Sequence, residues 1–595
     1  MIEKLISDTL IESVKSLYGQ DLPAKLAQVQ KTRVEFEGDY TVVVFPLLRM
    51  SKKKPEETAE ELGNEIKSKL DLIVDFNVVK GFLNLSVSNT YWLNYFDESS
   101  KESTYGVNND TTGNPIVIEY SSPNTNKPLH LGHIRNNLLG WSVSEINRAA
   151  GINVKKVNLV NDRGIHICKS MLAWQKWGED MTPESTNRKG DKLVGDFYVK
   201  FDQEYKKEIA SLIENGVDKV EAEKTAPLLL EAKQMLKKWE DGDPEVKDLW
   251  LKMNTWVYSG FDVTYKRLGI DFDKVYYESE TYLLGKDIVI EGLEKGVLFK
   301  KEDGSVWCDL TDVGLDQKLL LRADGTSVYM TQDLGTAQLR YDDYKPSGLV
   351  YVVGNEQNYH FDVLKLIMKK LGRPWAETMH HLSYGMVELP HGKMKSREGT
   401  VVDADDLMDE MYQTAKRTSE ALGKFDDFSE EESHKLYTML SLGALKYFML
   451  KVDPKRTMMF NPEESIDFTG NTGPFIQYTH ARIKSVLRKA TEAAISFDNV
   501  DLSNSVLEAK EKSIIKLIHE FPATVKQAAD SLSPALVANF AYELAKEYNQ
   551  FYHELPMMKE TNLVKRDLRL AISAFTANTI KTAMGLLGID VPERM

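Results

Sequence analysis

The sequence predicts an α/β nucleotide-binding fold, with a smaller α+β domain before it and an all-helical domain after it. An apolar run from Ile116 to Tyr120 is typical of a buried strand, and it ends in turn residues before a helical pattern from Ile134 to Ala150. A second apolar run, Val154 to Val160, also stops at a polar turn. Because strand, turn and helix alternate, we expect a βαβ unit in an open α/β sheet.

Length and composition are those of an ordinary multidomain globular protein. At 595 residues the chain is too long for one core, and 42% of its residues are apolar and 28% charged. The two cysteines, Cys168 and Cys308, lack the spacing of a disulfide framework or a zinc site, which suits a reducing compartment. There is no signal peptide and no apolar run of membrane-spanning length, so we expect a cytoplasmic protein without membrane contact.

Residues 1–110 are predicted to form the α+β domain. Val42–Leu47 and Val78–Val87 have strand-like patterns, and Pro55 opens a helical pattern between them. The segment 99–114 is polar and rich in Asn, Thr and Gly, which is typical of a linker.

The α/β domain is predicted to span residues 111–430. Residues from about 180 to 265 are highly charged with few strand signals, so we interpret them as a helical insertion that acts only as a connector. After it, we expect strands at Val306–Leu310, Ser327–Met330 and Gly348–Val353.

Polar stretches follow the predicted strands. They are the loop 121–133, the turn Asn161–Gly164, the segment Thr331–Gly335, the segment Gly354–Phe361 and a basic, glycine-bounded loop, Gly392–Thr400. Ligands of open α/β sheets bind outside the carboxyl ends of the strands. We therefore expect these stretches to converge on one crevice.

The loop 121–133 carries His130 and His133 beside a predicted helix N-terminus. Such a terminus offers unpaired N–H groups and positive dipole character to a triphosphate, and the histidines could grip phosphate oxygens that gain charge in a transition state. Gly132 between them has no Cβ to block a flat base. A loop that only caps a helix explains this short motif about as well, so the downstream motifs decide.

Residues 431–595 are predicted to form the all-helical domain. Helical patterns cover Lys435–Lys451, Phe475–Lys489, Val506–Leu532, Ala535–Tyr552 and Arg566–Leu587. The net charge of −15 speaks against an extended nucleic-acid surface, although local basic clusters could still provide one.

Two motifs together resemble those of class I aminoacyl-tRNA synthetases: His130–His133 at the first strand–helix turn, and the KMxxS-like loop that begins at Lys393. Further segments narrow the resemblance to arginyl-tRNA synthetases: Glu119–Asn124, Asn161–Gly164, Tyr329–Asp333, Gly354–Phe361, Gly473–Arg482 and Leu586–Met595. The resemblance implies a Rossmann-like catalytic domain between an N-terminal tRNA-contacting domain and a helical anticodon-binding domain.

The resemblance implies a two-step reaction. ATP activates L-arginine to arginyl-adenylate, and the arginyl group then passes to the 3′ end of tRNA(Arg). No covalent enzyme intermediate is required, so catalysis rests on positioning and charge stabilisation. ATP is a substrate and brings Mg²⁺ with it, no resident metal site is implied, and the family suggests a monomer.

The family motifs also imply roles for individual residues of this chain. The residues with implied catalytic roles are His130, His133, Lys127 and Lys393. The residues implied to contact ATP are Pro123, Asn124, His130, Gly132, His133, His360, Lys393, Ser396 and Arg397. The arginine pocket is expected to comprise Glu119, Asn124, Glu278, Tyr329, Asp333 and Gln357. Contacts with tRNA fall on Gln477, Tyr478, His480 and Arg482.

Some of these roles have plainer alternatives. Asp333 taken alone would more often be a helix cap. Tyr478 could simply lie on a packed helix face, with Gln477 and Arg482 pointing outward.

One position departs from the family pattern. The second lysine of the KMSKS loop is replaced by Ser396, which is followed by Arg397. We hypothesise that Lys127, just before His130, takes part of the missing role, with Lys395 and Arg397 as rivals.

Two other functions fit parts of the pattern. The altered loop would suit a synthetase-like protein that binds tRNA or senses arginine without charging tRNA. A small-molecule adenylyltransferase can share the histidine motif, but it would not need the C-terminal helical domain. An adenylation assay titrated with tRNA distinguishes the three.

Overall fold

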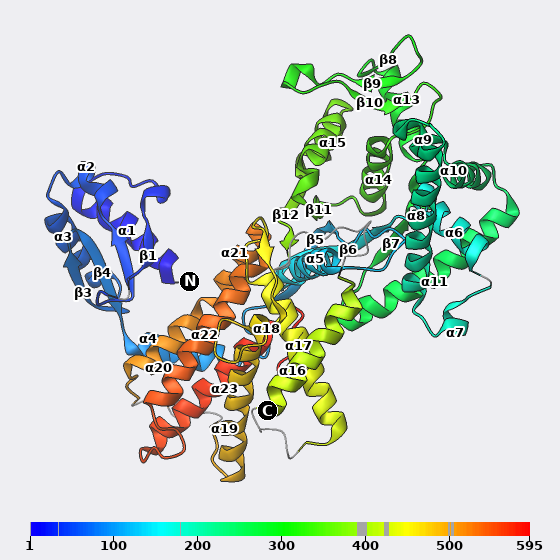
Figure 1. Cartoon of the computed structure of the whole chain (residues 1–595). Helices are drawn as coiled ribbons and strands as arrows, with labels where there is room; N and C mark the ends of the chain where they lie inside the picture. The colour runs from blue at the N-terminus through cyan, green and yellow to red at the C-terminus, as the bar shows by residue number, and fades with distance from the viewer. Residues whose placement is uncertain are drawn as a thin grey trace. The chain divides into compact units, whose positions relative to one another are not determined.

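Figure 1 shows the computed structural model, which describes residues 2–33, 35–178, 180–388, 402–421, 428–497, 500, 502 and 505–595. The chain forms two compact units. The first comprises Met1–Tyr105, Val486–Glu520 and Glu547–Thr576, and the second comprises Gly106–Ser485, Phe521–Lys546 and Ala577–Met595. The domain boundaries expected at residues 110 and 430 stay predictions.

A five-stranded parallel sheet forms the centre of the second unit, in the order β12-β11-β5-β6-β7. Its register places Ile116 opposite both Val154 and Gly348. The sheet confirms the predicted α/β class and three of its strands, while β7 and β12 are additional because short runs with lysine or histidine give weak strand signals. The strands are β5 (Asn108–Glu119), β6 (Ala150–Val160), β7 (Lys274–Tyr277), β11 (Gly348–Gly354) and β12 (Met379–Tyr384).

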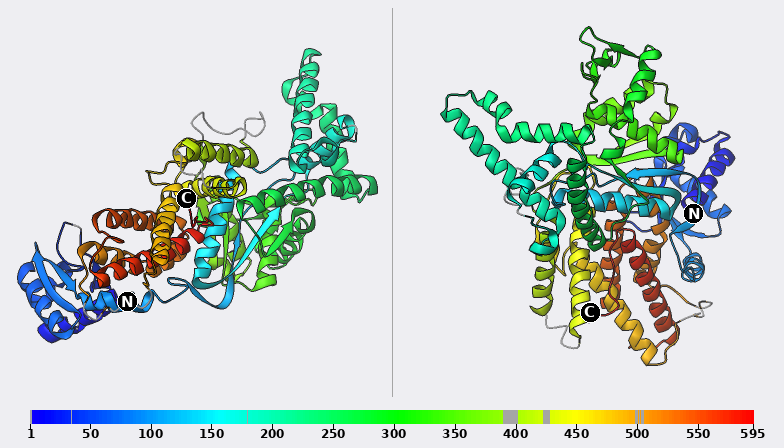
Figure 2. Two further views of the ribbon diagram at one scale, coloured as in Figure 1. Left: turned by 90° about the horizontal axis from the view of Figure 1, so that it is seen from below. Right: turned by 90° about the vertical axis from the view of Figure 1, so that its right-hand side faces the viewer.

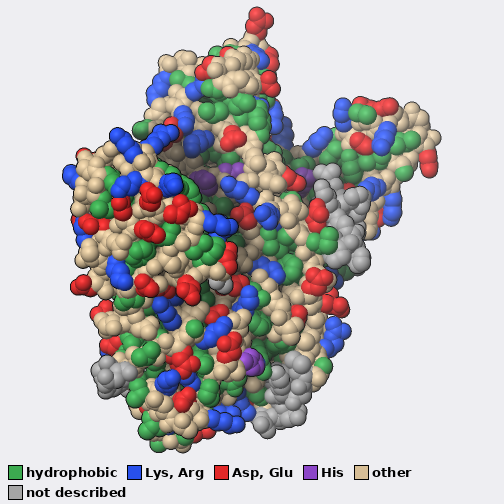
Figure 3. Space-filling model, turned by 90° about the vertical axis from the view of Figure 1, so that its left-hand side faces the viewer, with side chains coloured by type: hydrophobic (Ala, Val, Ile, Leu, Met, Phe, Trp, Pro, Cys, Tyr) green, Lys and Arg blue, Asp and Glu red, His purple; other side chains and the backbone are tan. Residues whose placement is uncertain are grey.

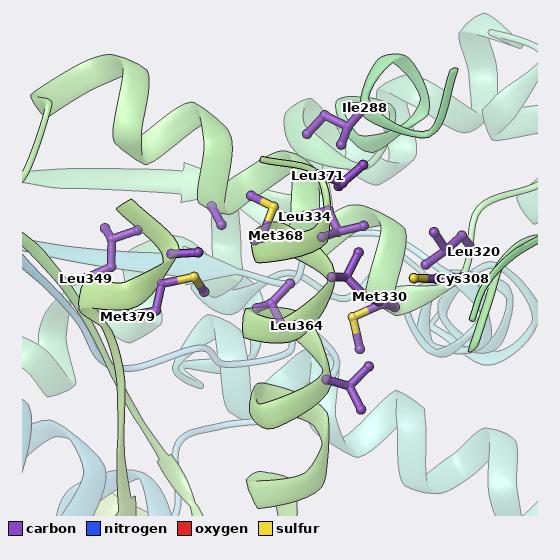
Figure 4. Packing of buried hydrophobic residues seen from close by; sticks show 14 of the residues in the cluster. Ile288, Cys308, Leu320, Met330, Leu334, Leu349, Leu364, Met368, Leu371 and Met379 are labelled. Atoms are coloured by element: carbon purple, nitrogen blue, oxygen red, sulfur yellow. The ribbon is translucent and has the colours of Figure 1, made fainter. Parts of the chain in front are cut away.

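Helices cover both faces of this sheet (Figure 2). Helix α5 (Leu131–Ala149) packs on one face, and α14 (Tyr329–Tyr344) and α15 (Asn358–Lys370) pack on the other. Between the sheet and α14 and α15 lies a buried hydrophobic core to which Leu334 and Leu364 contribute (Figure 4). This core fixes α14 and α15 against the sheet, and thereby the polar residues at their N-termini.

Two predicted strands are corrected by the structure. β9 (Val306–Cys308) is a strand, but it pairs antiparallel with β8 (Leu298–Lys300) and β10 (Lys318–Leu321) in a separate sheet. The strand expected at Ser327–Met330 is wrong, because α14 begins at Tyr329. Short apolar runs specify neither the sheet they join nor, on their own, the element they form.

The expected insertion is helical, as predicted. In Figure 2 its helices stand away from the sheet. Pro183, Pro227 and Pro244 each occupy the first position of a helix, where a missing N–H costs nothing. The helices are α7 (Pro183–Thr186), α8 (Gly190–Glu214), α9 (Lys219–Thr225), α10 (Pro227–Glu240) and α11 (Pro244–Leu268).

Further elements complete the second unit. They are α6 (Ile165–Trp177), α12 (Glu278–Thr281), α13 (Gly285–Glu294), α16 (Ala404–Ala421), α17 (Glu430–Leu450), α18 (Pro462–Ser465) and the strand pair β13 (Val387–Glu388) with β14 (Met458–Met459). Gly285 is required where α13 crosses α14, since a Cβ there would lie 1.7 Å from the Thr331 carbonyl oxygen.

The C-terminal part of the chain is helical, as predicted. The single helix expected at Val506–Leu532 is two helices, because Pro522 cannot donate its backbone hydrogen bond and instead starts a new helix. The helices are α19 (Gly473–Glu492), α20 (Ala509–His519), α21 (Phe521–Ser531), α22 (Pro534–Glu554) and α23 (Leu563–Gly585).

The N-terminal part of the first unit is α+β, as predicted. Its antiparallel sheet has the order β1-β2-β4-β3, and Val78–Val87 is a hairpin rather than one strand because Lys80 and Gly81 both adopt positive φ. The expected linker 99–114 is partly wrong, since β5 already begins at Asn108. The elements are α1 (Ile2–Tyr18), β1 (Val29–Lys31), β2 (Tyr40–Val43), α2 (Leu48–Ser51), α3 (Pro55–Lys69), β3 (Ile73–Val79), β4 (Phe82–Val87) and α4 (Asn89–Ser99).

None of the helices in the described ranges is both long and apolar enough to cross a bilayer.

Candidate active site at the carboxyl edge of the sheet

Four neighbouring strands end at one edge of the central sheet, and each is followed by polar residues. β5, β6, β7 and β11 run parallel, so their carboxyl ends lie together. The residues at these ends include Glu119, Asn161, Glu278 and Gln357. The predicted convergence of turns is therefore present among the described residues, and the unpredicted strand β7 brings Glu278 to the same edge.

The first two turns are joined through their backbones. The Asn161 N–H donates to the Pro123 carbonyl at 2.9 Å, and the Thr125 N–H donates to the Asn161 carbonyl at 3.0 Å. Ser121 adopts a positive φ of 62°, and the Asn136 side chain accepts its N–H at 2.6 Å. The loop before the histidines is thus held against the turn after β6.

The two histidines form the first turn of α5. The Gly132 N–H donates to Nδ1 of His130, and the His130 N–H donates to Nδ1 of His133, each at 3.2 Å. The two ring centroids lie 3.9 Å apart. Capping occupies only Nδ1 of each ring, so capping and ligand binding do not exclude each other.

Both imidazoles are neutral near pH 7. Burial, together with the charge of Lys127, lowers the pKa of His130 to about 4. Burial, followed by the charges of His130 and Lys127, holds the pKa of His133 well below its ordinary value. Because each Nδ1 accepts a backbone N–H, we assign the single proton of each ring to Nε2. Each histidine then has one neutral N–H donor that capping does not use.

Gly132 and Lys127 shape the surroundings of His130. A Cβ on Gly132 would lie 3.1 Å from Cε1 and 3.2 Å from Nδ1 of His130, so glycine allows this ring to fold over the helix start. Burial lowers the pKa of Lys127. Its positive charge lies close enough to His130 and His133 to lower their pKa values as well.

Lys393, Ser396 and Arg397 lie outside the described residues. The chain just after them is described: the Leu131 N–H donates to the Val402 carbonyl at 3.1 Å, and the Ala404 N–H donates to the Leu129 carbonyl at 2.9 Å. The segment that follows the KMSKS-like loop is thus paired directly with the histidine motif.

Asp333 and His360 come together from α14 and α15. Nε2 of His360 lies 2.5 Å from Oδ2 of Asp333. Asp333 is not the N-cap of α14, which is Val328, so the capping alternative is wrong. Tyr329 lies one turn before Asp333 on the same helix face, and its side chain is 79% exposed.

Glu278 is a second carboxylate at this edge, and it is buried. The pKa of Glu278 is raised to about 7, mainly by burial. The charges of Asp162 and Asp333 contribute to this rise, whereas Arg163 and a hydrogen bond with Gln332 oppose it. A carboxylate that titrates near neutral pH beside Asp333 is suited to a cationic ligand, because the cation would favour its ionised form.

Glu119 already has a cationic partner. Its Oε2 forms an ion pair with the Arg340 guanidinium, and its Oε1 accepts a hydrogen bond from the Ser122 hydroxyl at 3.0 Å. Burial raises the pKa of Glu119, and Arg340 opposes that shift. Asn124 and Gln357 are exposed at the same edge.

On α19, two of the four predicted tRNA contacts are buried. Nε2 of Gln477 donates to the carbonyls of Met439 and Asp590, at 3.0 and 2.7 Å, and Nδ1 of His480 lies 2.9 Å from the Pro592 carbonyl. The expectation that Gln477 faces outward is therefore wrong, because both side chains hold the C-terminal segment. Tyr478 and Arg482 are partly exposed, with the guanidinium 4.8 Å from the ring centroid.

Arg340 and Asp162 are charged residues that the sequence assigned no role. Both are buried, and each contacts a residue or turn of the site. Asp162 belongs to the turn Asn161–Gly164, which the sequence places at a strand end without giving this carboxylate a role. Arg340 has no signal beyond its charge within a helical segment, and only the fold shows that it reaches Glu119.

Three family models match the chain. One described as "tRNA synthetases class I (R), catalytic domain" matches residues 100–461, "DALR anticodon binding domain" matches 476–595, and "Arginyl tRNA synthetase N terminal domain" matches 1–87. Together with the parallel sheet and the paired histidines at its edge, the first match defines a class I aminoacyl-tRNA synthetase.

Relatives are similar over the full length. Proteins named arginine–tRNA ligase from Bacteroides fragilis and Bacteroides thetaiotaomicron are each 58% identical over 595 residues, covering 100% of both chains. The chain therefore belongs to the arginyl-tRNA synthetase family. The structure of the Thermus thermophilus arginyl-tRNA synthetase has the same fold, with a TM-score of 0.80 at 23% identity and 100% coverage of both chains. That of Plasmodium falciparum gives 0.78 at 19% identity, covering 100% of this chain and 99% of the other.

Proposed function

We propose that this chain activates L-arginine with ATP and transfers it to the 3′ end of tRNA(Arg), at the carboxyl edge of its parallel sheet. The observation that carries the proposal is the grouping of chemistry at this edge. Two neutral imidazoles cap the helix that would face a triphosphate. Two carboxylates, Glu278 after β7 and Asp333 on α14, lie close enough for the charge of Asp333 to raise the pKa of Glu278.

His130 and His133 act on the phosphates. When the arginine carboxylate attacks the α-phosphate, negative charge grows on the phosphate oxygens and on the leaving pyrophosphate. Two neutral N–H donors at a helix N-terminus stabilise that charge without moving a proton. Pro123, Asn124 and Gly132 form the surface on which the nucleotide lies.

Positive charge beside the pyrophosphate comes from lysines and from the substrate. Lys127 supplies it from the histidine loop, and Lys393, Ser396 and Arg397 supply further contacts from the KMSKS-like loop. Mg²⁺ enters bound to ATP and shares this task.

Arginine is selected by its guanidinium group. Five donors and no acceptor require carboxylates, which Glu278 and Asp333 provide, with Tyr329 beside Asp333. Glu119, Asn124 and Gln357 would hold the α-amino and carboxylate end of the substrate. Because lysine would leave part of this fork-shaped site unpaired, it loses roughly 1–3 kcal/mol for each stranded group.

His360, which is expected to contact ATP, also contacts a carboxylate of the arginine pocket. It is 2.5 Å from Asp333, so we propose that it orients this carboxylate toward the guanidinium. The contact of His360 with ATP stays a prediction.

The C-terminal helical part binds the anticodon, as its family model's description indicates. Tyr478 and Arg482 are suited to stacking on splayed bases and to contacting phosphates. On the face drawn in Figure 3, Lys and Arg side chains are scattered among Asp and Glu, so any basic footprint on this face is local. A cytoplasmic monomer is part of the proposal, and the two cysteines, both free and buried, agree with a reducing compartment.

The test is tRNA charging by the purified chain with ATP, Mg²⁺, tRNA and radiolabelled amino acid. We expect arginine to enter the tRNA fraction and lysine to be excluded. A protein that binds tRNA(Arg) but leaves it uncharged would instead be a non-catalytic relative. Adenylate formation on a small molecule, with no effect of tRNA, would indicate an adenylyltransferase.

A further inference from the structure

Asp162, in the turn after β6, is hydrogen-bonded to the helical insertion. Asp162 is 1% exposed, and its backbone carbonyl accepts hydrogen bonds from Nε1 of Trp250 at 2.6 Å and Nδ2 of Asn254 at 3.2 Å. Its carboxylate Oδ2 accepts a third from the Tyr258 hydroxyl at 2.8 Å. Trp250, Asn254 and Tyr258 are spaced by four residues, so they form one stripe along α11.

The same carboxylate also binds the start of α12. Oδ1 of Asp162 accepts the Ser279 N–H at 2.8 Å, and Oδ2 accepts the Ser279 hydroxyl at 2.7 Å. Ser279 directly follows Glu278, whose side chain lies at the guanidinium end of the proposed pocket. The position of Glu278 is therefore set by a residue that the insertion holds.

Arg163, the next residue, is held by the insertion as well. Its guanidinium forms an ion pair with Glu240 at 2.5 Å and lies 3.9 Å above the ring of Tyr282 and 5.4 Å from that of Trp239. Asp162 and Arg163, two consecutive residues of this turn, thus both contact the insertion and the segment next to Glu278.

We propose that Asp162 is a positioning residue through which the helical insertion sets the arginine-binding carboxylate Glu278. The inference rests on the proposed role of Glu278 in binding the guanidinium. It replaces the expectation that the insertion is a connector without a part in the chemistry. The pocket is assembled from β6, β7 and α11 together, and its geometry depends on contacts that never touch the substrate.

The pH dependence of arginine binding tests this proposal, because it depends on the charges near Glu278. These charges belong to Asp162 and Arg163 from the turn after β6, and to Asp333 from α14. Asp162→Asn keeps the size of the side chain but removes a negative charge near Glu278, so the pH at which arginine binding is lost moves to a lower value. Loosening that lets water reach Glu278 would lower this midpoint as well, because burial is the main cause of its raised pKa. A second variant that keeps the charge of Asp162 therefore distinguishes the two causes.

The experiment measures arginine-dependent ATP–pyrophosphate exchange from pH 5.5 to 8.5 on the full chain, with tRNA(Arg) present throughout. For Asp162→Asn we expect the KM for arginine to rise about tenfold or more, while the KM for ATP stays within about twofold of the wild-type value. The pH at which arginine binding is half lost on the acid side should be lower than in the wild type. Tyr258→Phe keeps the charge and removes one hydrogen bond. It raises the KM for arginine about threefold and leaves the midpoint unchanged.

Two controls separate the possible failures. Tyr205→Phe removes a tyrosine hydroxyl that bonds the Glu223 carbonyl at 2.6 Å, elsewhere in the insertion, and leaves all constants unchanged. Glu278→Gln must itself raise the KM for arginine; if it does not, the proposed role of Glu278 fails. If Glu278→Gln has its effect while Asp162→Asn changes neither KM nor midpoint, only the positioning role of Asp162 is overturned. A loss of kcat with unchanged KM for arginine would overturn it too.

Discussion

Replacing His130 by Asn separates the two uses of its imidazole. Oδ1 of Asn lies close to the position of Nδ1 and can accept the Gly132 N–H, and Asn is among the best N-cap residues. The Nε2–H donor, which we assign to the phosphates, is lost. We therefore expect His130→Asn to fold and unfold like the wild type while its activation step is slow.

The size of the effect follows from the donor that is removed. Losing one preorganised N–H donor to a developing oxyanion costs about 2.7–4 kcal/mol, or roughly 10²–10³ in kcat. His130→Ala loses the same donor and the cap, so it adds about 1 kcal/mol of lost stability. The kcat values of the two variants should agree, and their thermal midpoints should differ.

The assay is the kcat of ATP–pyrophosphate exchange at saturating arginine and ATP, paired with thermal unfolding of each variant. An Asn variant with wild-type kcat would refute the phosphate role. An Asn variant as unstable as Ala would refute the capping geometry. The pH profile adds a check: since the pKa of His130 is about 4, kcat should not fall as pH rises through 6.5, as it would if a protonated imidazole were needed.

Four other substitutions test the rest of the site. Glu278→Gln should raise the KM for arginine roughly 10- to 100-fold, and in the wild type this KM should rise as pH falls below about 7, because the protonated carboxyl no longer pairs with a guanidinium. Gly132→Ala should lower the kcat of exchange about tenfold by pushing the His130 ring from its place, with binding of arginine unchanged. Lys127→Ala should lower the same kcat about tenfold, and an unchanged activation rate would assign the missing cation to Lys395 or Arg397. Gln477→Ala should destabilise the chain to urea by about 1–3 kcal/mol without a change in the KM for tRNA, and a raised KM with intact stability would contradict its buried role.

Local sequence patterns predicted the elements whose signals are local. The runs at β5, β6 and β11 lie between turn residues and are long enough to be recognised as buried strands. β7 and β12 are short or interrupted by histidines, and β9 joins a different sheet. Whether these short segments form strands, and which sheet each one joins, depends on pairing with distant segments. The sequence of a single segment does not identify its pairing partner.

The site could be predicted where a motif places chemistry beside a strand end. His130 and His133 follow from spacing and from the helix that starts between them. The partners of Glu119 and Asp333 could not be predicted, because Arg340 and His360 reach them from other helices. Gln477 was misjudged for the same reason: helical periodicity gives a face, but only the fold shows that the chain's last residues cover that face.

Arginine-dependent ATP–pyrophosphate exchange by the purified chain, with and without tRNA(Arg), tests the central claim most directly. Exchange that requires arginine and fails with lysine is the predicted result. If exchange appears only with tRNA, the tRNA completes the site, and if it appears without tRNA, the site is preformed. No exchange under either condition, with tRNA still bound, would contradict the claim that this sheet edge activates arginine.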